Sequence, residues 1–469
     1  MLKPKIALVK VSSDAFGGIE KKEKRKKSIM EQIQSYPPLG LCYLEAYLNS
    51  KGITYVEIID CVEREYTSTK CAEYIVKRKF DVVGISATSF SLKSVDALIK
   101  QIRQREGEIT IILGGVHVTY HPEIIKVVDA DYGIRGDGEE SFFNFLTNFS
   151  HGINGLVYKE NGEVRYNKPA KISNLDTLPF PSIINHKYKF PFYNGKIYTM
   201  ITSRGCPYDC IFCGLPHKGV FRKRSAENVF SELEFLKQKG YDYIDFKDDC
   251  FSFERERVVE LCNFIIKSKL KISWGTEVRA DLVDYDLLEL MKEAGCHNLK
   301  FGIESGVLRI RNEIIGKKLS DEAIFDLVKW CRKLKIKSVG YVLFGLPTES
   351  LKEMEQTIKF IRKLDLDFMD ILLSVIIPGS RLYEEALSEK KIKEEVWEEI
   401  AEGNGQPPIY IPERVSLKDM MSLQSRAYRN FYSNPVRIFN EIKSIRSLDK
   451  LISRLRFIYN VYFGRLLKY

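Results

Sequence analysis

The first 150 residues alternate between short continuous apolar runs and apolar residues at helical spacing. Short runs rich in Val and Ile, bounded by Gly and Asp, predict buried strands at residues 5–11, 55–59, 82–86, 109–113 and 132–134. Helical spacing between them predicts helices at 39–50, 71–79, 93–105 and 139–149. Strands that alternate with helices of this length need crossover connections, so we predict an α/β, Rossmann-like domain with a parallel sheet over residues 1–150.

The pattern changes after residue 150. Asn161-Gly162 separates two apolar runs, which is a strong signal for a β-hairpin at residues 156–166. Prolines and aromatic residues between positions 178 and 193 are typical of an extended segment. We therefore predict a hairpin and linker over residues 151–195.

A longer alternation of strands and helices begins near Tyr198. Predicted strands end near Ser203, Lys247, Val278, Glu304, Phe344 and Ile376, and helices are predicted at 227–239, 257–268, 321–333 and 351–364. Six such units predict an incomplete (β/α)6 TIM-type barrel over residues 196–411, with its chemistry where the strands end. Residues 412–469 lack strand patterns and predict a basic, helical C-terminal region.

The composition is that of an ordinary globular protein. Of the 469 residues, 44% are hydrophobic and 29% are charged, which excludes a wholly disordered or fibrous chain. No apolar run reaches the ~18 residues of a membrane-spanning helix, and the N-terminus lacks the pattern of a signal peptide. Ten cysteines without a secretion signal indicate a reducing compartment, so we expect a cytoplasmic protein.

The formal net charge of +10 is unevenly distributed. Residues 20–27 include six basic residues in eight, and residues 412–469 contain twelve Lys or Arg against four Asp or Glu. Such patches favour anionic partners or form solvated faces. The C-terminal region interleaves apolar and basic residues, which suits either helices that close the open side of the barrel or peripheral contact with an anionic membrane. We favour the first alternative.

Three cysteines share one short loop directly after the first barrel strand. Cys206, Cys210 and Cys213 are spaced as C-x3-C-x2-C. Three thiolates in a tight loop can bind three irons of a cubane iron-sulfur cluster and leave the fourth iron open. A structural zinc site is one alternative, and His217 could supply its fourth ligand. Three unrelated buried thiols are the other.

The loop resembles the signature of the radical S-adenosylmethionine (SAM) enzymes, and the resemblance extends along the barrel. It implies that the three cysteines bind a [4Fe-4S] cluster whose open iron binds the amino and carboxylate groups of SAM. It also implies an external electron donor, such as flavodoxin or ferredoxin, whose electron cleaves SAM to a 5′-deoxyadenosyl radical. Phe212 matches the aromatic residue that packs near the adenine in that family.

Further landmarks of this resemblance lie at the strand ends. Asp248 and Asp249 follow the second strand, where the family binds the SAM amino group, although the usual Gly-Gly-Glu is absent. Such a pair is also typical of a helix cap or a turn. Arg279 follows the third strand and could pair with the methionyl carboxylate, because a guanidinium fork matches a carboxylate. Glu304 and Ser305 match the element that contacts the ribose, and Gly345 follows the fifth strand.

The N-terminal domain resembles the cobalamin-binding domain that precedes many radical SAM barrels. The matching segments are 36–45, 114–117 and 136–140. The expected cobalamin contacts are Ser86, Thr88, Gly114, Gly115, His117, Gly136, Gly138 and Glu139. Glycines directly after buried strands would also let a ligand approach the backbone closely. A Rossmann-like domain without a ligand is the alternative.

One cobalamin motif is missing. The sequence contains no Asp-x-His-x-x-Gly, the motif whose histidine binds cobalt from below. We therefore expect base-off cobalamin without a protein histidine ligand. His117 and His121 are interpreted as polar groups near the nucleotide tail or as surface residues.

These features predict a cobalamin-dependent radical SAM methyltransferase that acts on an unactivated carbon of a small-molecule or lipid substrate. An oxidative cyclase or ring-rearranging enzyme with the same cofactors is the first alternative, and a non-catalytic cobalamin-binding carrier or regulator is the second. No recognisable RNA-binding module follows the barrel, so we expect no nucleic-acid partner.

Overall fold

The computed structural model describes residues 4–12, 36–183, 196–216 and 218–433. The chain forms two compact units, which interleave along the sequence. The first unit contains residues 1–188, 213–217 and 376–408, and the second contains 189–212, 218–375 and 409–469. The predicted boundaries at 150, 195 and 411 follow the chain in order, whereas the two units exchange short segments.

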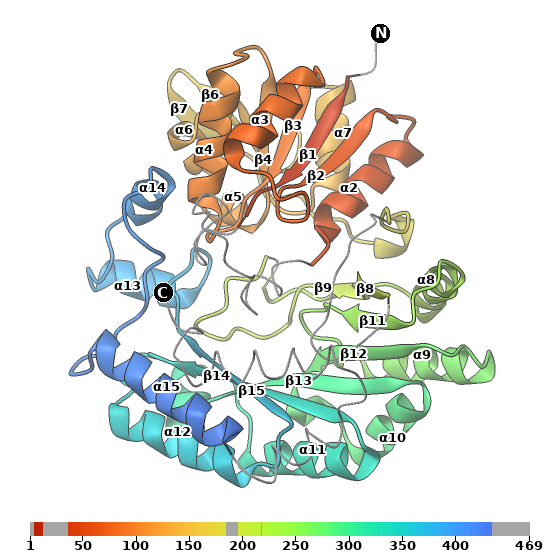
Figure 1. The fold of residues 1–469 in the computed structure, drawn as a ribbon, viewed down its shortest axis with the longest axis vertical. Coiled ribbons are helices and arrows are strands. Elements are labelled where there is room, and N and C mark those ends of the chain that lie inside the picture. Colours follow the sequence, from red (N-terminus) through yellow and green to blue (C-terminus); the bar gives the residue numbers. More distant parts are fainter. Residues whose placement is uncertain (1–3, 13–35, 184–195, 217, 434–469) are drawn as a thin grey trace. The chain divides into compact units, whose positions relative to one another are not determined.

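The first unit contains a seven-stranded sheet (Figure 1) in the order β2-β1-β3-β4-β5-β6-β7. Its parallel part consists of β1 (Ile6–Lys10), β2 (Val56–Asp60), β3 (Val82–Ser86), β4 (Thr110–Gly114) and β5 (Tyr132–Ile134). These strands match the predicted runs with ends displaced by no more than one residue. The predicted parallel, Rossmann-like sheet is confirmed.

The predicted hairpin is present and extends this sheet. Strands β6 (Leu156–Glu160) and β7 (Glu163–Tyr166) pair antiparallel, and β6 pairs antiparallel with β5. The turn residues Asn161 and Gly162 have φ of 52° and 80°, as a tight hairpin of this type requires. The hairpin that we expected to precede the linker therefore belongs to the first sheet.

Helices pack on both faces of the first sheet. They are α2 (Leu39–Ser50), α3 (Ser68–Lys77), α4 (Leu92–Arg103), α5 (Val116–Tyr120), α6 (Ile124–Val127) and α7 (Glu139–Thr147). A core that includes Ile6, Leu8 and Leu48 joins the sheet to α2 and α7, while α3 and α4 lie side by side on the other face (Figure 1). The short helices α5 and α6 were not predicted.

The second unit contains six parallel strands in the open order β8-β11-β12-β13-β14-β15, with β8 and β15 at the edges. The strands are β8 (Ile197–Met200), β11 (Tyr243–Phe246), β12 (Ser273–Val278), β13 (Cys296–Glu304), β14 (Lys337–Phe344) and β15 (Phe368–Leu373). The accompanying helices are α8 (Ala226–Gln238), α9 (Arg255–Lys267), α10 (Tyr285–Glu293), α11 (Asp321–Leu334) and α12 (Leu351–Lys363). The predicted six-unit alternation is confirmed, with α10 as an addition.

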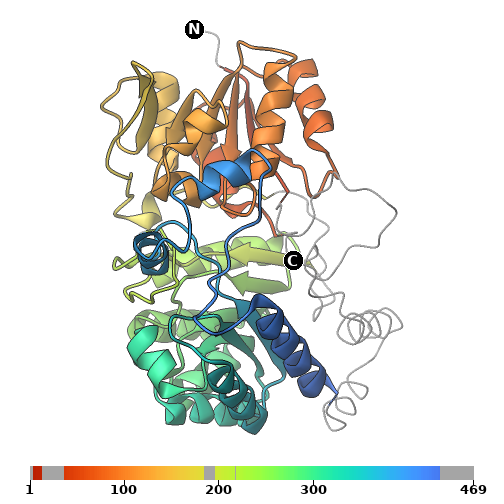
Figure 2. The ribbon, with the colours of Figure 1, turned by 90° about the vertical axis from the view of Figure 1, so that its left-hand side faces the viewer.

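Helix α15 (Leu417–Tyr432) lies along the edge strand β15 of the second unit (Figure 2). The Gln424 side chain donates a hydrogen bond to the backbone oxygen of Ile371 at 2.6 Å, and the Ile371 N–H donates to the Tyr428 hydroxyl at 2.9 Å. The Tyr432 hydroxyl donates to the backbone oxygen of Met369 at 2.9 Å. Side chains of α15 thus bind backbone groups that a neighbouring strand would otherwise bind.

The predicted basic run at 20–27 and the C-terminal segment after residue 433 lie outside the described residues. The choice between barrel capping and membrane contact therefore stays a prediction. Of the C-terminal region, the structure describes α15, which packs on β15. Within the described part of the chain, none of the helices has the length and apolar character needed to cross a membrane.

Candidate functional site

The cysteine loop begins and ends in a short antiparallel pair. Strands β9 (Ser203–Arg204) and β10 (Arg222–Lys223) flank the loop and bring its two ends together. Inside it, the N–H of Gly219 donates to the backbone oxygen of Cys206 at 2.8 Å. The two ends of the loop that contains the predicted cluster ligands are therefore held together by backbone hydrogen bonds.

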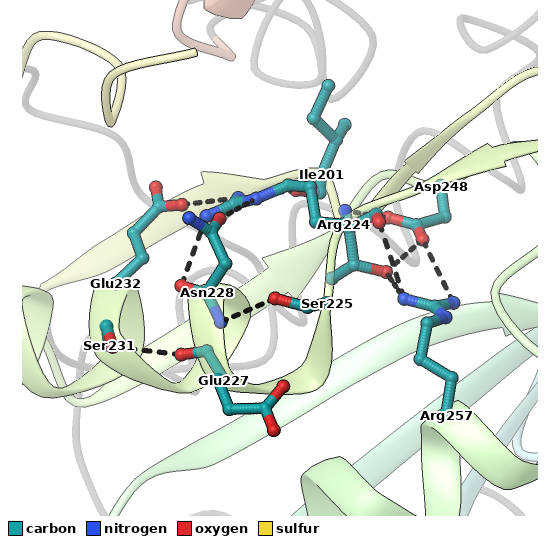
Figure 3. Close-up of polar contacts among 10 residues, drawn as sticks. Ile201, Arg224, Ser225, Glu227, Asn228, Ser231, Glu232, Asp248 and Arg257 are labelled. Atoms are coloured by element: carbon teal, nitrogen blue, oxygen red, sulfur yellow. Dashed lines mark hydrogen bonds and ion pairs between the residues drawn. The ribbon is translucent and has the colours of Figure 1, made fainter. Parts of the chain in front are cut away.

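Asp248 anchors the chain just before this loop (Figure 3). Its carboxylate accepts hydrogen bonds from the Thr202 N–H at 2.7 Å, from the Thr202 hydroxyl and from the Ser203 hydroxyl at 2.6 Å. The Arg257 guanidinium lies 3.9 Å from the same carboxylate, and both side chains are buried. Burial raises the pKa of Asp248, against the opposing effect of Arg257. This predicted SAM ligand is fully engaged inside the protein.

A second buried ion pair supports the same stretch (Figure 3). Arg224 and Glu232 form a pair at 2.5 Å, and Arg224 also donates to the backbone oxygen of Ile201 at 2.9 Å. The Arg224 N–H donates to the backbone oxygen of Thr202 at 2.9 Å. Two buried pairs thus hold the residues between β8 and the loop from opposite sides.

Asp249 differs from its neighbour because it is exposed and faces the loop. Its carboxylate accepts a hydrogen bond from the Gly205 N–H at 2.8 Å, directly before Cys206. A hydrogen bond with the Cys250 thiol lowers the pKa of Cys206 to about 7, although burial and Asp249 act in the opposite direction. Cys250 is itself buried, and its thiol contacts Cys206, a predicted cluster ligand.

Cys210 and Phe212 pack into an apolar cluster at the carboxyl end of the barrel. The cluster contains Ile310, Ile315, Leu343 and Leu346 among its buried members. Between the two site residues, the N–H of Ile211 donates to the backbone oxygen of Ile315 at 3.1 Å. Burial raises the pKa of Cys210, and the nearby charges of Lys317 and Arg279 oppose that rise. Positive charge beside Cys210 suits a thiolate.

Arg279 lies against the loop but is already bound within the protein. Its guanidinium donates to Asp281 at 3.0 and 2.8 Å and to the backbone oxygen of Lys317 at 2.7 Å. It also stacks 3.8 Å from the ring centre of Tyr208, a residue of the cysteine loop. The predicted role in binding the SAM carboxylate remains a prediction, and the observed contacts fix where the guanidinium lies.

The end of β13 places Glu304 and Ser305 differently. Glu304 adopts a left-handed backbone conformation, with φ of 59°, and its carboxylate forms a buried ion pair with Lys317 at 2.6 Å. The Ser305 hydroxyl lies 3.1 Å from the Thr357 hydroxyl of α12 and is fully buried. Strain of this kind in a non-glycine residue is common at functional sites. Glu304 therefore remains the stronger candidate of the two.

Gly345 turns the chain after β14. With φ of +84°, it has no room for a side chain, because a Cβ atom would lie 2.5 Å from Met420 of α15. Its N–H and that of Leu346 donate to Glu349 at 3.0 and 3.2 Å. Burial raises the pKa of Glu349 to about 8, despite these two hydrogen bonds. No sequence motif marks Glu349, Lys317 or Cys250 as site residues.

Cys213 belongs to the other compact unit, with residues 213–217. There the Tyr120 hydroxyl donates to the backbone oxygen of Leu215 at 2.5 Å, and Cys213 contributes to the raised pKa of Tyr120. The alternative zinc ligand His217 lies outside the described residues. Among the residues that the structure describes, no three metal-binding side chains converge.

The donor chemistry nevertheless fits an iron-sulfur cluster. The three loop cysteines form no disulfides and are half-buried, whereas the other seven cysteines are buried. Ordering of ligands and metal binding are coupled, so a converged set of sulfur atoms is not required beforehand. Three thiols in one loop leave an iron of a cubane cluster open.

In the first unit, the predicted glycines divide into two groups. Gly115 and Gly136 have φ of +102° and +82°, and a Cβ atom there would lie 2.6 and 2.2 Å from the backbone oxygens of Ala87 and Ala170. Their need for glycine comes from neighbouring backbone. A Cβ atom at Gly114 would meet nothing closer than 4.0 Å, and one at Gly138 nothing within 4 Å. These two positions leave space at the strand ends that a ligand could fill.

His117 is not a surface residue, which corrects one of the two expectations for it. It is 1% exposed, and its Nδ1 lies 2.9 Å from the Ser89 hydroxyl. Its ring packs edge-on against Trp397 of α14 (Val396–Ala401), with 5.5 Å between centroids. Burial lowers the pKa of His117, so the ring is neutral. His121 is half-buried and pairs with Glu398 at 2.7 Å.

The other predicted cobalamin contacts lie at the carboxyl ends of β3 and β5. Ser86 is half-buried and ends β3, and Thr88 is exposed two residues later. Glu139 is buried at the first turn of α7. Ligands of parallel sheets bind at this edge, so these positions and the open glycines fit a ligand there.

Family models match both parts of the chain. The radical SAM superfamily model matches residues 200–361, and the B12 binding domain model matches residues 33–146. An uncharacterised methyltransferase of Pyrococcus horikoshii is 33% identical over 423 residues, covering 87% of this chain and 90% of that protein. An anaerobic magnesium-protoporphyrin IX monomethyl ester cyclase of Rubrivivax gelatinosus is 26% identical over 418 residues, covering 85% and 74% respectively.

The fold also resembles a solved structure. TsrM of Kitasatospora setae, a radical SAM methyltransferase solved with cobalamin and a [4Fe-4S] cluster bound, superposes with a TM-score of 0.68. The match covers 82% of this chain and 78% of that chain at 18% identity. Similarity at this level of identity establishes the fold.

Proposed function

The chain belongs to the cobalamin-binding radical SAM enzymes, and on that premise we propose that it is a methyltransferase that acts on a carbon atom of a small polar molecule. The observation that carries the proposal is the C-x3-C-x2-C loop, whose cysteines form no disulfides, together with the contacts that Arg279, Glu304 and Asp249 make near it. A member that had lost its chemistry would have no need of three thiols in this setting. The family and the loop together favour an enzyme over a cobalamin carrier.

The proposed cofactors are a [4Fe-4S] cluster, SAM and cobalamin. When bound, the cluster and SAM would supply a carbon-centred radical, and cobalamin would supply the methyl group. Cys206, Cys210 and Cys213 would bind the cluster, and Phe212 would pack against the adenine. Asp249 would receive the amino group of SAM, Arg279 its carboxylate and Glu304 its ribose.

The first unit would hold cobalamin at the carboxyl edge of its sheet. The open positions Gly114 and Gly138, together with Ser86 and Thr88, would line that edge. His117 bonds Ser89 through Nδ1 and packs on Trp397. Because the sequence contains no Asp-x-His-x-x-Gly, we propose base-off cobalamin without a histidine ligand.

Charged residues inside the barrel favour a polar substrate over a lipid. Lys300 lies 2.6 Å from Asp245 and 4.0 Å from Glu277, and Lys247 lies 2.8 Å from Asp245. Phe246 packs on Trp274, whose indole N–H donates to the backbone oxygen of Ala294 at the end of α10, so Phe246 faces the surrounding helices. Successive residues of a strand face opposite sides of the sheet. Asp245 therefore faces the barrel interior. Lys247 and Glu277 keep partly exposed side chains, and an acyl chain against them would desolvate their charges without replacing the lost hydration.

One anaerobic experiment tests the proposal. Protein reconstituted with iron, sulfide, cobalamin and SAM is reduced, and 5′-deoxyadenosine and S-adenosylhomocysteine are measured separately. Radical methyl transfer predicts both products, and predicts that Cys210→Ala abolishes 5′-deoxyadenosine. Cys262→Ala is the matched control, because Cys262 is buried within α9 and should leave both products unchanged. Absence of both products from a protein that holds cluster and cobalamin would contradict the proposal.

A cyclase is the second candidate, favoured by the cyclase relative that matches 85% of the chain. It would consume SAM to 5′-deoxyadenosine without transferring a methyl group. Continued 5′-deoxyadenosine formation without S-adenosylhomocysteine, across a panel of small polar substrates, would support it over the methyltransferase.

A further inference from the structure

A segment without a recognisable motif, residues 309–318, lies beside the cysteine loop. It starts with a π-helical turn, η4 (Arg309–Ile314), a rare conformation that is frequent at functional sites. Its Ile315 accepts the hydrogen bond from Ile211 of the loop, and Ile310 and Ile315 pack in the cluster that contains Cys210 and Phe212. The segment therefore supports the loop by backbone and side-chain contacts.

Lys317 in this segment holds Glu304. Their side chains form an ion pair at 2.6 Å, and both residues are more than nine-tenths buried. A Cβ atom at Gly302 would lie 2.0 Å from the Glu304 carboxylate and 2.4 Å from the Lys317 ammonium. The ion pair therefore occupies the space that a side chain at position 302 would need. A buried carboxylate needs such a partner to stay charged and oriented.

The same residue holds Arg279 through its backbone. The Lys317 oxygen accepts a hydrogen bond from the Arg279 guanidinium at 2.7 Å, and that guanidinium stacks on Tyr208 of the cysteine loop. Lys317 thus contacts both Glu304 and Arg279, and its charge also acts on Cys210. Among the described hydrogen bonds and ion pairs of Glu304 and Arg279, Lys317 is the partner that the two residues share; Asp281 binds Arg279 alone.

We propose that Lys317 is a positioning residue for SAM, which it acts on by orienting Glu304 and Arg279. This inference rests on the proposed function only as far as SAM binding, not methyl transfer. A Glu304 carboxylate without its ammonium partner would lose its fixed orientation, and its hydrogen bonds to a ribose would weaken. The hydrogen bond from Arg279 to the Lys317 backbone oxygen would survive a substitution of the Lys317 side chain. Such a substitution therefore tests the effect of Lys317 on Glu304 alone.

The test measures SAM affinity by calorimetry. SAM is titrated into cluster-loaded protein whose cluster stays oxidised, so no electron is available to cleave SAM, and the heat of binding gives Kd without turnover. We expect Lys317→Met to raise Kd at least about tenfold, with unchanged iron and cobalamin content, and Lys317→Arg to recover part of the loss. Lys318→Met is the matched control, since Lys318 is the neighbouring lysine and is exposed. It should bind SAM like the wild type.

A double variant separates positioning from a general loss of structure. If Lys317 acts through Glu304, Glu304→Gln combined with Lys317→Met should raise Kd no more than Glu304→Gln alone. Additive losses, or a Lys317→Met Kd within twofold of the wild type, would overturn the proposal. If Lys317→Met fails to fold, Lys317→Gln decides: a Kd within twofold of the wild type overturns the proposal, and a raised Kd supports it.

The two proposals fail in different ways. Wild-type protein that binds SAM but forms no S-adenosylhomocysteine would contradict the methyltransferase and leave the role of Lys317 intact. Wild-type affinity in Lys317→Met, in a protein that transfers methyl groups, would contradict only the role of Lys317.

Discussion

Replacing Asp248 should damage the fold, whereas replacing Asp249 should not. Asp248→Ala removes the acceptor of three hydrogen bonds from Thr202 and Ser203 and leaves the buried Arg257 without its carboxylate. Asp249→Ala removes one hydrogen bond at an exposed position. Asp248 and Asp249 look equivalent in the sequence, so the comparison of the two variants shows how much burial of the carboxylate contributes to the free energy of unfolding.

The expected magnitudes differ severalfold. Removing one partner of a buried ion pair costs ~3–5 kcal/mol, and the orphaned donors of Thr202 are part of that cost. Because burial raises the pKa of Asp248, the carboxylate itself carries a penalty, and we expect the lower half of the range. Loss of the hydrogen bond from the Gly205 N–H to Asp249 costs ~0.5–1.5 kcal/mol. At roughly 2–4 °C per kcal/mol, Asp248→Ala should lower Tm by about 6–16 °C.

Guanidinium chloride unfolding, followed anaerobically by circular dichroism, gives the comparison. The free energy of unfolding should fall for Asp248→Ala with an unchanged m-value, since the unfolded surface is the same. Asp248→Asn, which keeps the size and one acceptor, should be intermediate. A loss below about 1 kcal/mol for Asp248→Ala, or an equal loss for Asp249→Ala, would refute the argument.

Three further changes test other parts of the structure. Glu349→Gln should flatten the pH dependence of the free energy of unfolding. In the wild type, the Glu349 pKa is raised to about 8, so its contribution to stability is full below pH ~4.5 and is lost as pH rises through about 8. Unfolding measured at pH 5 and pH 9 tests this. Tyr428→Phe should cost ~1–3 kcal/mol and speed hydrogen exchange at the Ile371 amide; unchanged exchange would contradict the edge-strand role. Gly136→Ala should lower Tm, while Gly138→Ala should leave Tm unchanged and weaken cobalamin binding in an absorbance titration; equal Tm values would contradict the backbone clash at Gly136.

Strands and motifs were predictable because both depend on local sequence. The buried runs of the first sheet have few polar residues, so period and length alone locate their ends to within one residue. The spacing of the three cysteines identified the loop in the same way. The short helices α5 and α6 were missed because segments of five and four residues have too little periodicity to detect.

Contacts between distant residues were not predictable. Nothing in the sequence distinguishes Asp248 from Asp249; their roles differ because one side chain points into the protein toward Arg257 and the other toward the loop. Lys317 is one of many lysines and is marked only by its burial against Glu304. The exchange of segments between the two units is likewise a property of three-dimensional packing.

The contact between α15 and β15 also governs how the protein behaves in a crowded solution. A parallel sheet that does not close on itself ends in a strand with unpaired backbone groups, and such a strand can recruit another chain. Here Gln424, Tyr428 and Tyr432 occupy those groups on Ile371 and Met369. A chain cut before residue 417 would lose this cover while keeping all six strands, so self-association, rather than loss of folding, would be its first defect.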